Sequence, residues 1–199
     1  MKPLSRRFYA RGTVELARAL IGRMLLRQLP EGAVGGRIVE TEAYDGPEDP
    51  GSHAFRGRTP RNSVMFGPPG HLYVYFTYGM HYCANVVAES DGVPGAVLLR
   101  AVEPIEGLDI MSERRGTEVS RDLARGPGRL CKAFGLDRSM NGADLTQGAV
   151  WIEGRPRLRA DIQTSSRIGV KVGTEFLWRF YEPGPWTSGP AAMSRPLRR

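Results

Sequence analysis

The sequence predicts a single α+β domain, in which helices pack around a curved and mostly antiparallel β-sheet. β-Prone runs follow one another through short Gly- and Pro-containing turns, whereas helical signals are confined to three segments. The length of 199 residues suits one domain, and 41% hydrophobic with 25% charged residues is typical of a globular protein with a real core. We place this domain at residues 1–190 and expect a flexible tail at residues 191–199, where no periodicity remains.

The first expected elements are a helix and a pair of strands. The helix starts at Thr13, a candidate N-cap, and is closed by Gly22. Strands are expected at residues 24–29 and 37–44, with a Pro- and Gly-rich turn at residues 30–36 between them.

The middle of the chain combines a long loop with three further strands. Residues 45–70 are rich in Gly, Pro, Asp, Ser and Arg and are expected to be irregular. A loop of this length inside a compact domain is usually functional or disordered. Strands are then expected at residues 71–78, 82–89 and 96–103, separated by tight turns.

The elements after Pro104 have weaker signals. A helix is expected at residues 105–115, and a second one from about Gly128 to the glycine exit at Gly135. Residues 149–154 and the region 175–182 are expected to form strands or a strand pair.

The charge balance points to a polyanionic partner. Lysine and arginine number 28 against 21 acidic residues, which gives a net charge of +7 and a pI near 9.8. Arginine supplies nearly all of the positive charge, and its guanidinium fork suits phosphate oxygens. Nucleic acid is the first candidate; the alternative is a basic protein without such a partner.

Several other classes of site and location are not indicated. No apolar run approaches the roughly 20 residues that span a bilayer, so we expect no membrane association. Cys83 and Cys131 show no CxxC spacing, which favours a reduced, cytoplasmic protein. His53, His71 and His81 lack the spacing of metal ligands, and no phosphate-binding loop motif is present. We therefore expect neither a metal nor another cofactor.

Residues 39–57 gather carboxylates, an aromatic side chain and a histidine in one short run. Glu42 precedes the loop that carries His53, and a carboxylate among aromatic rings is suited to activating a bound water as a general base. The alternative is a solvated glutamate on an ordinary strand, and this is our interpretation of Glu40 and Glu48. Alternation along the strand is expected to place these residues on one face: Ile38, Glu40, Glu42 and Tyr44.

Tyrosines recur in the next predicted strand. Tyr73, Tyr75 and Tyr78 lie in it, and Tyr82 follows the turn. Alternating tyrosines form either a cross-strand stack in the core or a platform for stacking bases. Tyr78 borders the tight turn YGMH, which pushes its side chain outward, and a bulky residue at a hairpin tip is suited to wedging into a base stack.

Two basic segments are candidate phosphate contacts. The loop at residues 55–70 carries Arg58 and Arg61, and the segment GPGRLCK carries Arg129 and Lys132 at an expected helix start. The alternatives are a mobile basic loop in the first case and an ordinary capped helix in the second.

Many fragments of the chain occur together in a specific order. They include RIVETEAY, GPED, a histidine, TPRN, MF, PG, LYVY, YGM, an asparagine and VLLRA between about Arg37 and Glu103. Looser matches, such as GPGRLCKA, AVWIEG, SSRIGV, RFY and PW, extend over nearly the whole chain. In this order and spacing the chain resembles the alkyladenine DNA glycosylase family, also called the 3-methyladenine DNA glycosylase family.

The resemblance implies a monofunctional base-excision-repair enzyme with the fold of that family. Such an enzyme flips an alkylated or deaminated purine out of duplex DNA and hydrolyses its N-glycosidic bond with an activated water, leaving an abasic site. We expect it to act as a monomer on double-stranded DNA containing damaged purines. The absence of a prominent lysine nucleophile favours a glycosylase without lyase activity.

The resemblance also implies a role for each matching residue. Glu42 matches the general base, and Arg100 matches the arginine that helps to hold the catalytic water. Tyr78 matches the intercalating side chain. The residues that match the base-binding pocket are Tyr44, His53 and Tyr75, which sandwich the base, and Asn85, which disfavours guanine by crowding its amino group.

Two other function classes remain open at this point. A non-catalytic damaged-DNA or RNA-binding protein would use the same basic and aromatic surface without releasing a base. A hydrolase of small nucleosides would need neither the arginine loop nor the tyrosine at the hairpin tip.

Overall fold

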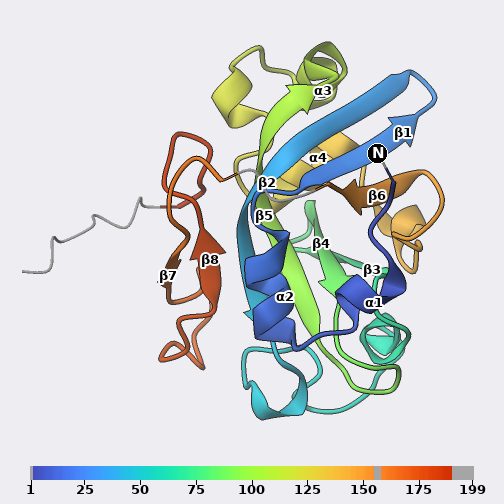
Figure 1. Ribbon diagram of the computed structural model, residues 1–199, viewed down its shortest axis with the longest axis vertical. Helices are drawn as coiled ribbons and strands as arrows, with labels where there is room; N and C mark the ends of the chain where they lie inside the picture. Colours follow the sequence, from blue (N-terminus) through green and yellow to red (C-terminus); the bar gives the residue numbers. More distant parts are fainter. Residues whose placement is uncertain (1, 155–157, 190–199) are drawn as a thin grey trace, which may run out of the picture.

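Eight antiparallel strands form one curled sheet in the computed structural model, which describes residues 2–154 and 158–189 (Figure 1). The strands are β1 (Met24–Leu29), β2 (Gly32–Tyr44), β3 (Leu72–Thr77), β4 (His81–Val87), β5 (Ala96–Glu106), β6 (Val150–Glu153), β7 (Gln163–Ser165) and β8 (Arg179–Tyr181). The strand order is β3-β4-β5-β2-β1-β6, while β8 pairs with the second half of β2 and β7 pairs with β8. The predicted tail at residues 191–199 lies outside the described residues.

Helices cover this sheet, as predicted for an α+β fold. They are α1 (Arg6–Tyr9), α2 (Thr13–Leu20), α3 (Leu108–Arg115) and α4 (Pro127–Phe134), and short 3₁₀ turns lie at Gly46–Glu48, Ser63–Phe66, Ser120–Asp122 and Arg138–Met140. Helix α2 packs against β2 and β5, and α4 packs against β4 and β5 (Figure 1). Pro127 opens α4 and Gly135, with a φ of +62°, ends it, which confirms the predicted entry and exit. The fold class predicted from the sequence is confirmed.

Strand β2 is the central and longest strand, and it overturns one prediction. The predicted turn at residues 30–36 is confined to residues 30–31, and the glycines that follow belong to the strand. A Cβ atom on Gly36 would lie 2.7 Å from the carbonyl oxygen of Glu103 in the neighbouring strand. These glycines therefore permit a close backbone approach within the sheet and do not mark a turn.

The prediction that Ile38 shares a face with Glu40 is wrong. The register between β2 and β5 shifts on both sides of Glu40, which disrupts the regular alternation there. Ile38 packs in the main hydrophobic core together with Ala43, whereas Glu40 and Glu42 both bond to Arg100. The irregularity thus gathers the polar side chains on the side away from the core.

The helix predicted at residues 105–115 begins later. Ile105 and Glu106 still belong to β5, because Glu106 pairs with Gly35, and the chain turns at Gly107 with a φ of +68°. Strand β5 therefore continues to Glu106, beyond the expected 96–103. Other boundaries agree within one or two residues, but α1 and β7 were not predicted, and only residues 179–181 of the region 175–182 form a strand.

The sequence predicted Thr13 as the N-cap of α2, and this prediction is wrong. Gly12 occupies that position, and Glu89 from a distant loop accepts hydrogen bonds from the Thr13 N–H at 2.5 Å and from its hydroxyl at 2.9 Å. A carboxylate that lies far away in the sequence thus satisfies the start of the helix.

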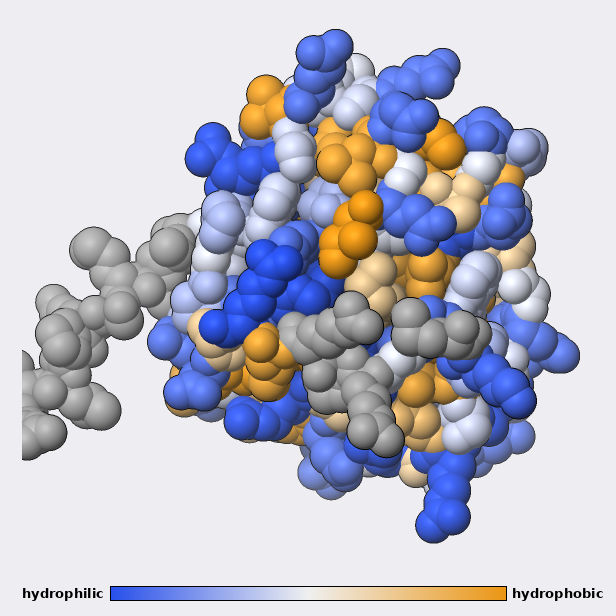
Figure 2. Space-filling view, turned by 45° about the horizontal axis from the view of Figure 1, so that its top comes forward, coloured by the Kyte–Doolittle hydropathy of each residue, from blue (hydrophilic) through white to orange (hydrophobic). Residues whose placement is uncertain are grey.

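The main core lies between α2, α4 and the sheet, and its buried side chains are almost all aliphatic or aromatic. Figure 2 shows hydrophilic residues over much of one face, with small groups of hydrophobic residues between them. In the described part of the chain, no helix has the length and apolarity needed to cross a membrane.

Candidate active site

Glu42 in β2 has a fully buried side chain. Its Oε2 accepts hydrogen bonds from the Tyr44 hydroxyl at 2.9 Å and from Nη1 of Arg100 at 3.2 Å, and its Oε1 accepts one from the Ile168 N–H at 2.7 Å. A carboxylate has about four acceptor positions. These three donors, all from described residues, leave one position on Oε1, which is where a general base would receive a proton from water. The interpretation of Glu42 as a solvated surface glutamate is wrong.

Two opposing influences act on the pKa of Glu42. Burial raises the pKa of Glu42 above its ordinary value, while the charge of Arg100 is the largest influence that lowers it. The Ile168 N–H and the Tyr44 hydroxyl also lower this pKa, and the neighbouring charge of Glu40 raises it. The pKa of Glu42 is therefore high for a glutamate, as suits a proton acceptor that works near neutral pH.

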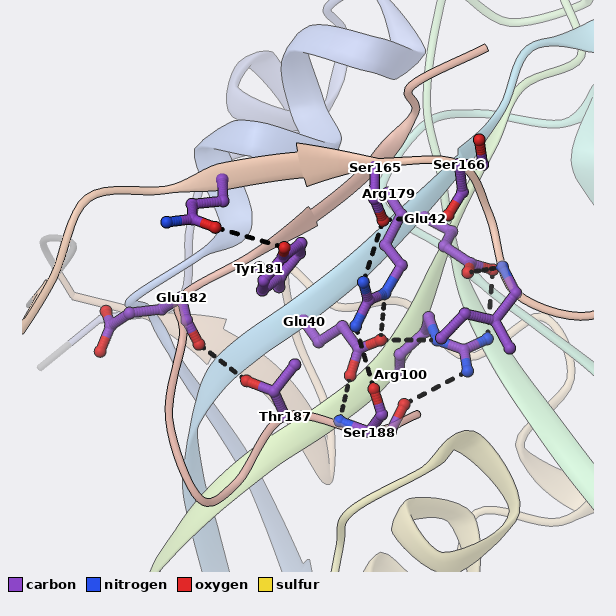
Figure 3. A network of polar contacts seen from close by, with 12 residues as sticks. Glu40, Glu42, Arg100, Ser165, Ser166, Arg179, Tyr181, Glu182, Thr187 and Ser188 are labelled. Atoms are coloured by element: carbon purple, nitrogen blue, oxygen red, sulfur yellow. Dashed lines mark hydrogen bonds and ion pairs between the residues drawn. The ribbon is translucent and has the colours of Figure 1, made fainter. Parts of the chain in front are cut away.

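Glu40 is the second buried carboxylate of the site (Figure 3). Its Oε1 accepts hydrogen bonds from Nε of Arg100 at 2.9 Å and from Nε of Arg179 at 2.7 Å, and its Oε2 accepts one from the Ser188 N–H at 2.6 Å. The sequence-based interpretation of Glu40 as a solvated residue is therefore wrong, whereas Glu48 is exposed as expected. Arg100, predicted as a site residue, bridges the two glutamates.

A small pocket brings together the four residues predicted to bind a base. The pocket is lined by Tyr44, Gly51, His53, Met65, Tyr73, Tyr75, Asn85 and Ala96. The rings of His53 and Tyr75 meet edge to face with centroids 4.6 Å apart, and Tyr73 and Tyr75 lie 5.3 Å apart. The space left free is about 20 Å³, enough for a water molecule but not for a purine.

Hydrogen bonds fix the polar atoms of this pocket. The amide Nδ2 of Asn85 donates to the carbonyl oxygen of Tyr73 at 3.0 Å, and Nδ1 of His53 lies 2.9 Å from the Tyr73 hydroxyl. Partial burial, together with the nearby charge of Arg61, lowers the pKa of His53, so its ring is neutral at neutral pH. Burial raises the pKa of Tyr75, which keeps its hydroxyl protonated.

A buried ion pair between Arg167 and Asp49 packs against the ring of Tyr44. The guanidinium of Arg167 lies 4.7 Å from the centroid of the Tyr44 ring, and its Nη2 donates to Oδ1 of Asp49 at 2.7 Å. Both charged side chains are fully buried. Arg167 also donates to the carbonyl oxygen of Ala43 at 2.9 Å, which ties the segment before β8 to the end of β2.

Tyr78 stands at the tip of the β3–β4 hairpin and is 83% exposed. Its φ of +51° is uncommon for a residue with a side chain, and Gly79 follows with a φ of +66°. The Met80 N–H donates to the carbonyl oxygen of Thr77, which closes a tight β-turn with Tyr78 and Gly79 at its centre. The predicted outward position of Tyr78 is confirmed; a strained, exposed aromatic residue of this kind is a candidate functional feature.

The predicted basic residues lie on both sides of this hairpin. Arg61 is exposed, with its guanidinium 5.4 Å from the Tyr75 ring centroid, and Arg58 lies near Phe66. Arg129 and Lys132 lie on α4, where Arg129 forms an ion pair with Asp122 at 2.7 Å. One hollow beside the hairpin contains Arg61, and another, on the side of α4, contains Tyr78 and Arg129.

The described residues include no group of three His, Cys, Asp or Glu side chains arranged to hold a metal ion. Cys83 and Cys131 are both buried free thiols.

Together these features define a class of protein. The site combines a buried carboxylate held by an arginine with an adjoining aromatic pocket, and the protein is strongly basic. This combination is typical of a hydrolase that acts on an aromatic group attached to a polyanion. Residues 7–185 match the Methylpurine-DNA glycosylase family, and the chain belongs to this family. The family predicted from the sequence is thereby confirmed, as is the enzyme class, a monofunctional DNA glycosylase.

Relatives of similar length support this assignment. A protein of Chlorobaculum tepidum is 48% identical over 202 aligned positions, which cover 100% of this chain and 97% of the relative. Proteins of Chlorobaculum parvum and Methanocella arvoryzae are each 51% identical, covering 90% and 92% of this chain and 87% and 93% of the relatives. All three are named "Putative 3-methyladenine DNA glycosylase".

Three residues of the site were missed from the sequence. Arg167, Arg179 and Ser188 reach the neighbours of Glu42 in β2 from the C-terminal part of the chain, Arg179 from β8 and the other two from the segments before and after it. The only sequence signal was the fragments SSRIGV, RFY and PW, which contributed to the resemblance without indicating a role.

Proposed function

We propose that this protein removes alkylated or deaminated purines, such as 3-methyladenine, from double-stranded DNA by flipping the nucleotide and hydrolysing its N-glycosidic bond. The observation that carries the proposal is Glu42, a fully buried carboxylate with one acceptor position left beside an aromatic pocket. A nucleic-acid-binding module has no use for such a group, and a structural ion pair would not require the adjoining pocket.

Glu42 acts as the general base in this proposal. Its ionised carboxylate takes a proton from the attacking water, and its charge stabilises the oxocarbenium-like sugar as the bond to the base breaks. The arginine bonded to Oε2 favours the ionised form. None of the described residues that line the pocket is a lysine, which supports attack by water and not by an amine.

The pocket binds the flipped base between aromatic rings. Tyr44 supplies one face, and His53 and Tyr75 supply the other. A purine cannot enter the 20 Å³ left free, so the gap between Tyr44 and the His53–Tyr75 pair must widen when the base arrives. Damaged purines that carry positive charge gain cation–π attraction to these rings. Asn85, held by the Tyr73 carbonyl, crowds the exocyclic amino group of guanine.

Tyr78 and the basic residues act on the duplex. The tyrosine at the hairpin tip fills the space left by the flipped nucleotide, and Arg58, Arg61, Arg129 and Lys132 contact the phosphates on either side. We propose that the protein acts as a monomer, because one site is sufficient for one lesion.

Base release from duplex oligonucleotides tests this function directly. Glu42→Gln should reduce excision of hypoxanthine or ethenoadenine about 10²- to 10⁴-fold, the range that general-base catalysis contributes. The variant should still bind the damaged duplex. Near-wild-type excision by Glu42→Gln would show that Glu42 is not the base, and tight lesion binding without release by the unmutated protein would indicate a binding protein.

Tyr78→Ala provides an independent test of flipping. Because Tyr78 is exposed, its loss should leave folding stability within about 0.5 kcal/mol of the parent. The fluorescence change of an extruded ethenoadenine should decrease while non-specific duplex binding stays similar. An unchanged fluorescence signal would contradict the wedge role.

A further inference from the structure

Arg179 in β8 is a buried arginine that pairs with Glu42 through the backbone ladder between β2 and β8, while its side chain bonds to other residues. Its side chain is 2% exposed. Its Nε donates to Oε1 of Glu40 at 2.7 Å, Nη1 donates to the Ser165 hydroxyl at 2.9 Å, and Nη2 donates to the carbonyl oxygen of Ser188 at 2.9 Å. Figure 3 shows the guanidinium group of Arg179 between Ser165, Glu40 and Ser188, with Arg100 reaching the same Glu40 carboxylate from another direction.

Glu40 therefore shares one oxygen between two guanidinium groups. Arg100 reaches Oε1 with Nε at 2.9 Å, and its Nη1 remains directed at Glu42 at 3.2 Å. Ser188 closes the arrangement, since its hydroxyl accepts from Nη2 of Arg100 and its N–H occupies Oε2 of Glu40. Because Arg179 neutralises part of the charge of Glu40, Glu40 attracts Arg100 less strongly. Arg100 can therefore keep its hydrogen bond to Glu42.

We propose that Arg179 is a positioning residue for the base: by holding Glu40, it keeps Arg100 directed at Glu42 and keeps Glu42 ionised at the working pH. This inference rests on the proposed function, in which Glu42 is the general base. It assigns a part in the reaction to a residue that does not contact the reacting atoms.

The charges in this network give the effect a definite sign. With Glu42 ionised, the two arginines and two glutamates sum to zero. Without Arg179, the group carries a charge of −1, and Glu40 attracts Arg100 without competition. Both changes disfavour the ionised form of Glu42, so both raise its pKa.

The other groups that face Glu42 stay in place in such a variant. Tyr44 faces it from β2, Cys83 from β4, and the Ile168 N–H and Arg167 from the segment between β7 and β8. None of them bonds to Arg179 in the described structure, so a change in titration can be attributed to the Glu40–Arg100 path.

The experiment measures single-turnover excision of hypoxanthine from a duplex as a function of pH. In Arg179→Met, the acidic limb of the rate profile should move to higher pH by about one unit, so that the rate below the limb falls about tenfold. The rate should recover towards the parent value at high pH, and binding of the damaged duplex should be unchanged. A purely structural role would lower the rate equally at every pH.

Arg37→Met is the matched control. Arg37 is likewise a buried arginine bonded to two glutamates, Glu103 and Glu182, at 2.8 Å each. Its loss should lower stability comparably without moving the acidic limb. An equal limb shift in both variants would overturn the inference.

Two further variants keep the test decisive if Arg179→Met folds poorly. Arg179→Lys retains the charge and should leave the limb within about 0.3 pH unit. The double variant Glu40→Gln/Arg179→Met removes the competing carboxylate and should return the limb to the parent position. A limb that stays displaced in the double variant would show that Glu40 does not transmit the effect.

The outcomes separate this inference from the proposed function. If Glu42→Gln remains active, the proposed function fails. If Glu42→Gln is inactive but the acidic limb of Arg179→Met does not move, only the positioning role of Arg179 fails.

Discussion

The buried ion pair behind Tyr44 gives a prediction about folding stability that the structure makes quantitative. Arg167 and Asp49 are both fully buried, and Arg167 donates to both oxygens of the Asp49 carboxylate. In Arg167→Met, Asp49 would keep only two backbone donors, the N–H groups of Asp45 and Gly51. Removing one partner of a buried pair costs about 3–5 kcal/mol, because the other charge is left buried without compensation.

We therefore expect Arg167→Met to lower the free energy of unfolding by about 3–5 kcal/mol. For a chain of this size, this corresponds to a decrease in Tm of about 6–20 °C. Urea denaturation measures the free energy, and thermal unfolding measures the shift. A loss below about 1 kcal/mol would refute the reasoning, because it would show that the Asp49 carboxylate is not held in a dry environment.

Two comparison variants separate this charge effect from lost packing. Arg167→Met/Asp49→Asn removes both charges and should recover most of the stability. Arg114→Met breaks the partly exposed pair with Glu31 and should cost less than about 1 kcal/mol. If the double variant were no more stable than the single one, the loss would come from the packing of the arginine stem.

Two further predictions concern the ionisation of Glu42 and the backbone conformation at Gly46. Because burial raises the pKa of Glu42 in the folded state, its stabilising contribution is present below the unfolded-state pKa and is lost as pH rises through the folded-state pKa. Glu42→Gln should therefore raise Tm at neutral pH, with a smaller gain at about pH 4; thermal unfolding at both pH values checks this, and a gain independent of pH would contradict it. Gly46→Ala should destabilise by more than about 2 kcal/mol, since the added Cβ would lie 2.4 Å from the Pro94 carbonyl oxygen at a φ of +62°. Gly57→Ala, with a φ of +86° but open space around it, is the control and should cost only about 1 kcal/mol; equal losses would mean that the close contact does not matter.

Local patterns predicted those parts of the fold that depend on local chemistry. The β-branched and aromatic runs located β3 and β4 within a residue or two, and the Pro and Gly residues around α4 located its ends. The glycines before Arg37 were misinterpreted because their function is a contact with β5, whose approach no local pattern contains.

The same distinction applies to the site. Glu42 could be singled out because an aromatic residue and a histidine follow it closely in the sequence. Glu40, two residues earlier in the same strand, looked like an exposed glutamate because its partners come from far along the chain. Arg179 lies 139 residues away from it and Ser188 lies 148 residues away. The charge network around Glu42 is thus assembled by β8 pairing with β2, a contact that residue patterns do not reveal.

The charges of the buried residues affect how the net charge of the chain is interpreted. An excess of arginine could in principle be consumed by buried ion pairs, which would weaken the argument for a polyanionic partner. In the described structure, the buried charged residues are four arginines and six acidic residues, and their formal charges sum to −2. Since the whole chain carries +7, the rest of the chain carries +9. Within the described structure, burial therefore removes more negative than positive charge from contact with solvent, so it does not consume the excess of arginine. Such an excess favours association with a phosphate backbone, and the affinity should fall steeply as salt concentration rises.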